Sequence, residues 1–199
     1  HGPNAEDNPI QIPLPAGDAF GSGALSVRRT QLDPTRTAAE AGKPQTYRNH
    51  NTHWWDGSQL YGSSKAQNDK IRSFVDGKLK INANGTLPTE LLNGKPVTGF
   101  NDNWWVGLSM LHQIFTKEHN AIATRLKQTY PTASDQWLYD KARLVTSALM
   151  AKIHTVEWTP AVIANPVTER AMYANWWGLI GNASGRDKYQ AETRAWYED

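Results

Sequence analysis

Two long stretches of the chain carry apolar residues at the three- and four-residue spacing of a helix that buries one face. The first runs from Asn103 to about Gln128, with apolar positions Trp105, Leu108, Leu111, Phe115, Ile122, Ala123 and Leu126. The second runs to about Thr155, with apolar positions Leu138, Ala142, Val145, Leu149 and Ile153. Tyr130-Pro131 ends the first stretch, and Thr132 or Ser134 can cap the second. The pattern predicts a body built on two long helices.

Three shorter stretches predict smaller helices around this body. Helical spacing recurs from Ser64 to Asp76 and again from Thr168 to Leu179. Thr159-Pro160 is typical of an N-cap followed by proline in the first helical position. It predicts a short helix over 160–164.

Extended structure is predicted in only a few places. A small hairpin is expected between Leu79 and Leu87, around a turn at Asn84-Gly85. Ile10 to Pro15 alternates like a short extended segment whose prolines confine it to a sheet edge or to no sheet, and Ser26 to Arg29 is a second such piece. Residues 1–50 are otherwise irregular and rich in Pro, Gly, Asn and Thr, so we expect them to wrap over the helical body rather than fold alone.

The stretch Asn51–Ser64 concentrates oxygen-bearing side chains. Read as extended backbone, residues two apart point to the same side, which groups Thr52, Trp54, Asp56 and Ser58. Two hydroxyls, one carboxylate and backbone carbonyls form an all-oxygen set that suits calcium. A half-buried strand that enters a turn at Asp56-Gly57 is the alternative. The spacing by itself favours the strand, because one carboxylate is little charge for a calcium site.

His154 and Thr159 stand at the predicted junction between the second long helix and the short helix. One interpretation is a helix-terminal histidine favoured by the helix dipole, followed by an N-cap threonine. The other is an anion pocket, in which the imidazole, the hydroxyl and the free N–H groups of a new helix start converge on a carboxylate. The pattern by itself favours the first interpretation.

The histidines of the first long helix lack the spacing of a zinc protease site. Phe115 occupies the position one turn before His119 where a second ligand is required, and His112 lies too far away. HExxH and HxxEH are both absent. We therefore expect Glu118 and His119 to make polar contacts at the edge of a packing face.

Composition narrows the function classes. The chain of 199 residues has a net charge of +2 and no dense Lys/Arg run, which argues against a nucleic-acid partner. Its lack of cysteine excludes disulfides, thiolate metal sites and cysteine nucleophiles. No apolar stretch approaches the roughly 20 residues that span a bilayer and no signal-peptide pattern is present, so the localisation stays unknown. Because the chain opens at His1 in loop-like sequence and stops at Asp199 without a tail, we expect an internal fragment of a larger protein.

Four segments resemble the peroxidase–cyclooxygenase superfamily of animal-type haem peroxidases, and within it the fatty-acid alpha-dioxygenases and their bacterial relatives. They are NTHWWDGSQLYGSS at 51–64, LHQIFTKEHNAIATRL at 111–126, LYDKARLVTSALMAKIHTVEWT at 138–159 and RAMYANWWGLIG at 170–181. The resemblance implies a mainly α fold, with at most a small β-hairpin. It makes 1–199 a single partial haem-peroxidase-type domain, in which an irregular segment over 1–50 and a calcium loop at 51–64 precede a helical core over 103–181.

The resemblance also implies two cofactors, calcium and haem b. The superfamily's calcium loop follows the pattern Thr-x-aromatic-x-Asp-x-Ser, which Thr52, Trp54, Asp56 and Ser58 match. Its remaining ligand is an Asp directly after the distal haem histidine, whereas His1 is followed by Gly2. The distal histidine is thus expected before His1, and the proximal histidine and radical-forming tyrosine beyond Asp199, so no catalytic residue is expected in the chain. Since 101–105 contains neither the Arg nor the haem-linking Glu of mammalian members, the haem is expected to be non-covalent.

The function implied by the resemblance is addition of dioxygen to a long-chain fatty acid. In the alpha-dioxygenases an oxidised haem generates a tyrosyl radical, which removes a hydrogen next to the carboxylate, and dioxygen traps the product. A histidine and a threonine five residues later bind that carboxylate, and His154 and Thr159 match them. The clamp's arginine and any peripheral membrane contact are expected in regions outside this chain. The alternatives are a haem peroxidase that uses hydrogen peroxide on small reductants, and a non-catalytic calcium-stabilised binding fragment.

Overall fold

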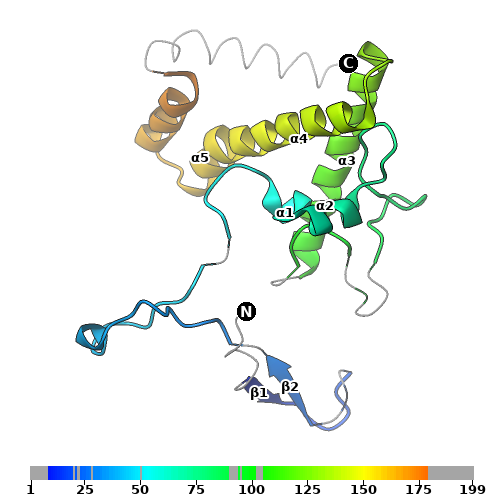
Figure 1. Ribbon diagram of the computed structural model, residues 1–199. Coiled ribbons are helices and arrows are strands. Elements are labelled where there is room, and N and C mark those ends of the chain that lie inside the picture. The colour runs from blue at the N-terminus through cyan, green and yellow to red at the C-terminus, as the bar shows by residue number, and fades with distance from the viewer. Residues whose placement is uncertain are drawn as a thin grey trace. The chain divides into compact units, whose positions relative to one another are not determined.

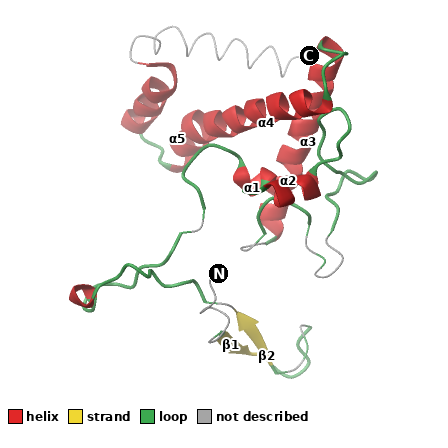
Figure 2. Cartoon of the chain, in the orientation of Figure 1, coloured by secondary structure: helices red, strands yellow, loops and turns green. Residues whose placement is uncertain are grey.

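The computed structural model describes residues 9–178, except for 20, 22, 28, 50, 90–93, 95 and 102–104. The chain divides into two compact units, His1–His53 and Trp54–Asp199. Across the described residues, helices predominate and the strands are confined to the first unit (Figure 2). The mainly α fold with one small hairpin is therefore confirmed.

The described part of the first unit contains a hairpin. Strand β1 (Ile10–Pro13) pairs antiparallel with β2 (Ala24–Val27), and Ile10 lies opposite Val27. Both strands are edges, which is why Pro13 is tolerated without a backbone donor. The first extended segment is confirmed, and the second lies two residues earlier than predicted. That the unit wraps over helices stays a prediction.

Polar side chains hold the rest of the first unit together, since none of its described residues is buried. Asp33 accepts hydrogen bonds at Oδ1 from the Thr35 backbone (2.9 Å) and hydroxyl (2.7 Å), and at Oδ2 from the Thr46 hydroxyl (3.1 Å). The Thr35 side-chain bond is the main reason why the pKa of Asp33 lies below its usual range. A capping box between Thr37 and Glu40 starts the short 3₁₀ helix η2 (Ala38–Glu40).

The second unit is helical, and its two longest helices pack against each other (Figure 1). Its elements are α1 (Ser58–Tyr61), α2 (Lys65–Ile71), α3 (Val106–Thr129), α4 (Asp135–Lys152), the π-helix η3 (Ile153–Trp158), α5 (Thr159–Val162) and a further helix over 166–178. Ser134 caps α4 by accepting a hydrogen bond from the Trp137 backbone. Both predicted long helices are confirmed. None of the described helices is long and apolar enough to cross a membrane.

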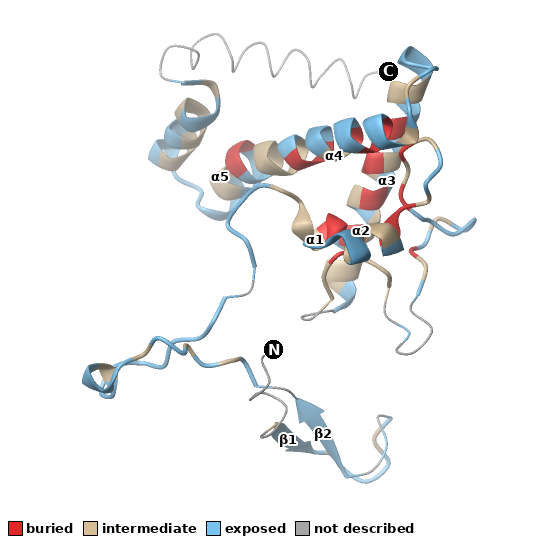
Figure 3. Ribbon diagram, viewed as in Figure 1, coloured by how far each residue is buried: buried red, intermediate tan, exposed pale blue. Residues whose placement is uncertain are grey.

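The core lies where α1, α2 and α4 meet (Figure 3). Its central side chains are Leu60, Tyr61, Ile71, Leu79 and Tyr139. The rings of Tyr61 and Tyr139 meet edge to face, with centroids 6.1 Å apart.

The buried face of α3 differs from the predicted apolar stripe. Its buried residues are His112, Thr116, His119 and Ala123, whereas Leu111 on the predicted stripe is 48% exposed. Two of the polar side chains on this face are hydrogen-bonded, since Thr116 donates to the His112 carbonyl (2.8 Å) and His119 finds partners in other segments. Val145 on α4 is likewise exposed against expectation.

The segment after α2 is irregular. The helix ends at Ile71, five residues before the predicted end at Asp76, because Arg72 takes an extended conformation and its guanidinium binds Asp135 (2.7 Å) and Gln136 (2.6 Å). The predicted hairpin is also wrong in its strands. The turn at Asn84-Gly85 forms, but Leu79 exchanges two backbone hydrogen bonds with the side chain of Asn120, at 2.8 and 3.0 Å.

Gly77 is a tight point of this segment against α4, and its replacement should destabilise the protein. It has φ +71°, and a Cβ there would lie 2.5 Å from the Tyr139 backbone nitrogen. Gly94 has φ +65° with nothing within 4 Å, so it isolates the conformational part of the cost. In urea denaturation we expect Gly94→Ala to cost about 1 kcal/mol of unfolding free energy and Gly77→Ala about 3 kcal/mol. Equal losses would contradict the close approach of this segment to α4.

Candidate functional site

Thr159 is the first residue of α5 and not an N-cap, and α5 directly continues the preceding π-helix. It has helical angles (φ −62°, ψ −46°), and its backbone N–H donates to the carbonyl of His154. The Thr159 hydroxyl donates to the same oxygen at 2.7 Å. Helix α4 thus continues through η3 into α5, and the predicted N-cap and free helix start are wrong. The pattern Thr-Pro is equally compatible with a first turn and with this continuation, because the helix continues by a π-turn that local sequence does not signal.

The π-turn brings His154 and Thr159 onto one side of the helix. In an α-helix, positions five residues apart are separated by about 140° around the axis. A π-turn closes at the fifth residue, so that His154 and Thr159 lie roughly one above the other. The two predicted carboxylate-binding residues are therefore brought together, by a different device from the one expected.

The imidazole of His154 lies against two indole rings. The Trp158 ring is stacked on it at a centroid distance of 5.4 Å and an angle of 16°, and the Trp55 ring is tilted against it at 4.9 Å and 54°. We call these three residues the aromatic cradle. Both indoles are about half exposed, and neither ring nitrogen of His154 is hydrogen-bonded to any residue in the described chain. The imidazole is thus held by its faces, while its nitrogens can meet a ligand.

The stretch Asn51–Ser64 forms no strand in its described residues, and the strand alternative is wrong. Asp56 Oδ1 accepts a hydrogen bond from the Ser58 backbone (2.9 Å), and Gly57 turns the chain into α1 at φ +64°. Trp54 is 73% exposed. Thr52 belongs to the first unit, and the other three predicted calcium ligands belong to the second. Because no described group of three or more His, Cys, Asp or Glu residues could hold a metal, the calcium site stays a prediction.

The loop that carries Asp56 follows the surface of α4. Arg143 donates to the Asp56 carbonyl at 3.4 Å, and a Cβ on Gly57 would lie 3.1 Å from the Ser147 hydroxyl. Trp55 then contacts His154 beyond the end of α4. The predicted calcium loop and the predicted substrate histidine are therefore neighbours, a relation that the spacing of the sequence does not indicate.

His119 lies at the centre of the second unit rather than at the edge of a packing face. It is fully buried, its Nε2 bonds to the Gly77 carbonyl (2.9 Å) and its Nδ1 bonds to the Tyr61 hydroxyl (2.8 Å). Since a carbonyl only accepts, Nε2 carries the proton and Tyr61 donates to Nδ1. Burial lowers the pKa of His119 to about 4, so the ring is neutral at pH 7. Both ring nitrogens of His119 are thus occupied, so the predicted polar contacts form, in the interior rather than at an edge.

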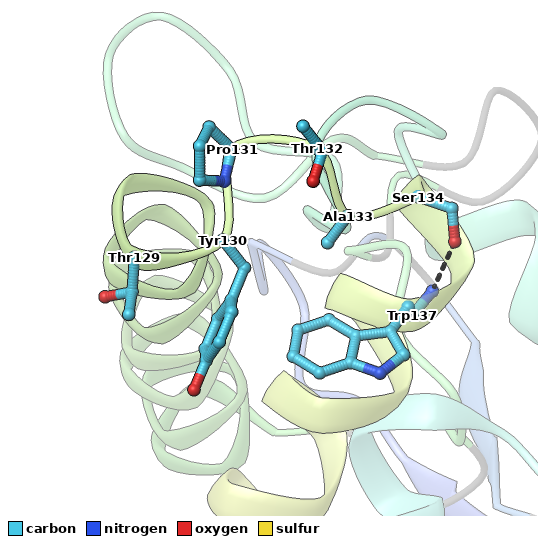
Figure 4. Close-up of a pocket in the computed structure, with 7 residues that line it drawn as sticks. All are labelled: Thr129, Tyr130, Pro131, Thr132, Ala133, Ser134 and Trp137. Carbon is cyan, nitrogen blue, oxygen red and sulfur yellow. Dashed lines mark hydrogen bonds between the residues drawn. The ribbon is translucent and has the colours of Figure 1, made fainter.

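A haem requires a pocket with a residue, such as histidine, that can bind its iron. Two hollows in the described chain can be considered for this role. One of about 430 Å³ lies at the turn between α3 and α4 and is lined by Thr129, Tyr130, Pro131, Thr132, Ala133, Ser134 and Trp137 (Figure 4). The other, of about 450 Å³, is lined by Ser73, Val75, Lys78, Leu79, Lys80, Ile81, Pro88 and Asn120. Neither contains a histidine to bind iron. His112 is buried and its ring nitrogens have no described partner, but it lines neither hollow. Neither of these two hollows therefore fits a haem by itself.

The fold is mainly α, and it places His154 and Thr159 on one side of a π-turn. The family model for animal haem peroxidases matches residues 2–196, and the chain belongs to that family. The family implies haem. The fold and the resemblance inferred from the four segments are thereby confirmed.

Similar proteins are alpha-dioxygenases. Alpha-dioxygenase PIOX of Nicotiana tabacum is 46% identical over 133 residues, which are 67% of this chain and 20% of the relative. Alpha-dioxygenase 2 of Arabidopsis thaliana is 38% identical over 175 residues, 86% of this chain and 27% of the relative. The crystal structure of the Oryza sativa fatty acid alpha-dioxygenase matches with a TM-score of 0.66 and 36% identity, over 87% of this chain and 28% of that chain. A structure of that enzyme with palmitic acid matches with the same TM-score of 0.66. The chain thus spans 20% and 27% of the length of these two curated relatives.

Acid should destabilise the protein through His119. The pKa of His119 is about 4 in the folded state, against 6.5 for an ordinary histidine. Its contribution to the free energy of unfolding is therefore fully present above pH 6.5 and is lost as the pH falls toward 4. The full loss corresponds to about 3 kcal/mol. Urea midpoints measured from pH 7 to pH 4 should fall steeply, and less steeply in His119→Gln.

His112→Leu is the matched control for this experiment, because burial lowers the pKa of His112 as well. His112→Leu should remove only the part of the pH dependence of stability that His112 contributes, and leave the part that His119 contributes. An unchanged slope in His119→Gln would show that the buried His119 does not titrate in this range.

Proposed function

We propose that the protein is a haem-dependent fatty-acid alpha-dioxygenase, in which this chain supplies part of the carboxylate site. The observation that carries the proposal is the 46% identity over 133 residues to an alpha-dioxygenase. The convergence of His154 and Thr159 on one side of η3 supports it. A long-chain fatty acid and dioxygen are the proposed substrates, and a tyrosyl radical formed outside the described residues is the proposed oxidant.

His154 and Thr159 would bind the carboxylate with an imidazole N–H and a hydroxyl, which form charge-assisted hydrogen bonds. The hydroxyl now donates to the His154 carbonyl, but that oxygen also accepts the Thr159 N–H. Rotation of the hydroxyl toward a ligand therefore leaves no buried carbonyl without a partner. Fixing the carboxylate determines which carbon faces the oxidant, so this pair acts by positioning.

The haem supplies the redox chemistry of the family, and we propose that it is bound without a covalent link. The stretch 101–105 contains no Glu that could form an ester with it. Because neither of the two hollows described above carries a histidine that could bind iron, we assign no step of the oxidation to the described residues.

Removal of the carboxylate site should weaken fatty-acid binding selectively. In the complete protein we expect His154→Ala and Thr159→Val to raise KM for palmitate by roughly 10- to 100-fold, the value of a hydrogen bond to a charged group. Thr159→Ser retains the hydroxyl and should stay within about threefold of the unmodified protein. Palmitate-dependent oxygen uptake measures the effect, and peroxide-driven oxidation of a small phenol is the control reaction.

Two outcomes would contradict this proposal. Undiminished palmitate oxygenation in His154→Ala would show that His154 does not bind the carboxylate. Phenol oxidation without any palmitate-dependent oxygen uptake in the unmodified protein would favour a peroxidase.

We also propose that Thr52, Trp54, Asp56 and Ser58 bind calcium, with the Trp54 backbone carbonyl as one ligand. The motif supports this, and so does the bond between Asp56 Oδ1 and the Ser58 N–H, which holds the carboxylate at the start of α1. EDTA should then lower the melting temperature relative to about 10 mM calcium, a concentration above the dissociation constants of extracellular calcium modules, which are about 0.1–1 mM.

Asp56→Asn is the informative variant for calcium, because the amide oxygen can still accept from Ser58 while the charge is lost. It should melt at the same temperature with EDTA and with calcium. Asp69→Asn removes a carboxylate that pairs with Lys65 on α2 and should keep the EDTA effect. An unmodified protein whose melting temperature ignores EDTA would contradict the site.

A further inference from the structure

The aromatic cradle restrains a side chain that exposure would otherwise leave mobile. His154 is exposed, and an exposed imidazole ordinarily samples several rotamers. Trp158 follows it on the same helix, whereas Trp55 reaches it from a loop about a hundred positions earlier in the chain. Two contacts from separate elements restrict the imidazole more than its helical neighbour does alone.

Trp55 is itself held in place by its neighbours along the loop. The backbone carbonyl of Asp56 accepts a hydrogen bond from Arg143, and its carboxylate accepts one from the Ser58 backbone N–H. The next residue, Gly57, fits closely against the Tyr61 ring, where a Cβ would lie 2.9 Å from two ring carbons. The backbone that follows Trp55 is thus held against α1 and α4. These contacts restrict the position of the indole beside His154.

We propose that Trp55 is a positioning residue, whose indole holds the imidazole of His154 in the orientation that binds the substrate carboxylate. This inference rests on the proposed role of His154. It adds a residue that has no polar contact with substrate and that precedes the carboxylate site by about a hundred positions. If the imidazole is already immobilised, binding does not lose its side-chain conformational entropy, and this difference corresponds to about fivefold in affinity.

The test uses the complete protein with Trp55→Ala, Trp55→Phe and Trp158→Ala. Trp137→Ala is the matched control, because Trp137 stacks edge to face on Tyr130 at 5.1 Å at the other end of α4. Two quantities are measured: the ring-proton chemical shifts of His154 in protein with ¹³C-labelled histidine, and KM and kcat for palmitate-dependent oxygen uptake. His154→Gln assigns the signals.

Trp55→Ala should move the His154 ring protons downfield, because the ring current of the indole is lost, and raise KM for palmitate about fivefold with kcat unchanged. Trp55→Phe restores an aromatic face and should recover most of both values. Trp158→Ala should act in the same direction, which keeps the test decisive if Trp55→Ala does not fold. Trp137→Ala should move neither quantity.

Unchanged KM in Trp55→Ala would overturn the inference, whether or not the His154 signals move. A fall in kcat that Trp55→Phe does not recover would overturn it as well, because it would indicate a different role. If His154→Ala also leaves KM unchanged, the carboxylate role of His154 has failed. A large effect of His154→Ala without any effect of Trp55→Ala removes only the role of Trp55.

Discussion

The hydrogen bonds of one buried imidazole join three separate parts of the second unit. His119 on α3 binds the Tyr61 hydroxyl at the end of α1 and the Gly77 carbonyl in the segment after α2. Both bonds lie in the interior, where loss of one partner leaves the other unsatisfied at a cost of about 1–3 kcal/mol. The position of α1 in turn fixes Gly57 and the loop before it, and that loop carries Trp55 to His154. The geometry of the proposed carboxylate site thus depends on a contact far from it in sequence.

Local pattern predicted the elements of this fold better than their packing. The two long helices follow from apolar periodicity, and the Ser134 cap and the Tyr130-Pro131 stop follow from local chemistry. The buried face of α3 does not, because His112, Thr116 and His119 count as polar in any periodicity, and the tertiary hydrogen bonds of His119 that draw this face inward involve residues far away in the sequence. The strands expected near Leu79 fail for the same reason, since Asn120 takes the hydrogen bonds that a strand partner would have made.

The construction of the candidate site could not be predicted from the sequence. Resemblance to a family assigned His154 and Thr159, and the structure brings them together through a π-turn rather than a helix start. Nothing in the sequence indicates a role for Trp55, because a tryptophan beside a predicted metal ligand is simply interpreted as part of the loop. Its role depends on a partner about a hundred positions away, and such a contact becomes visible only in three dimensions.

The π-turn at 153–158 also links helix type to residue spacing. A π-turn holds one residue more than an α-turn, so deletion of a single residue between His154 and Thr159 would restore a regular α-helix from α4 into α5. The pair would then be four residues apart, which an α-helix also places on one side, about 40° apart around the axis. The present spacing of five residues in a regular α-helix would instead separate the two side chains by about 140°. The geometry of the pair therefore depends on helix type and residue spacing together, which a count of matching residues does not measure.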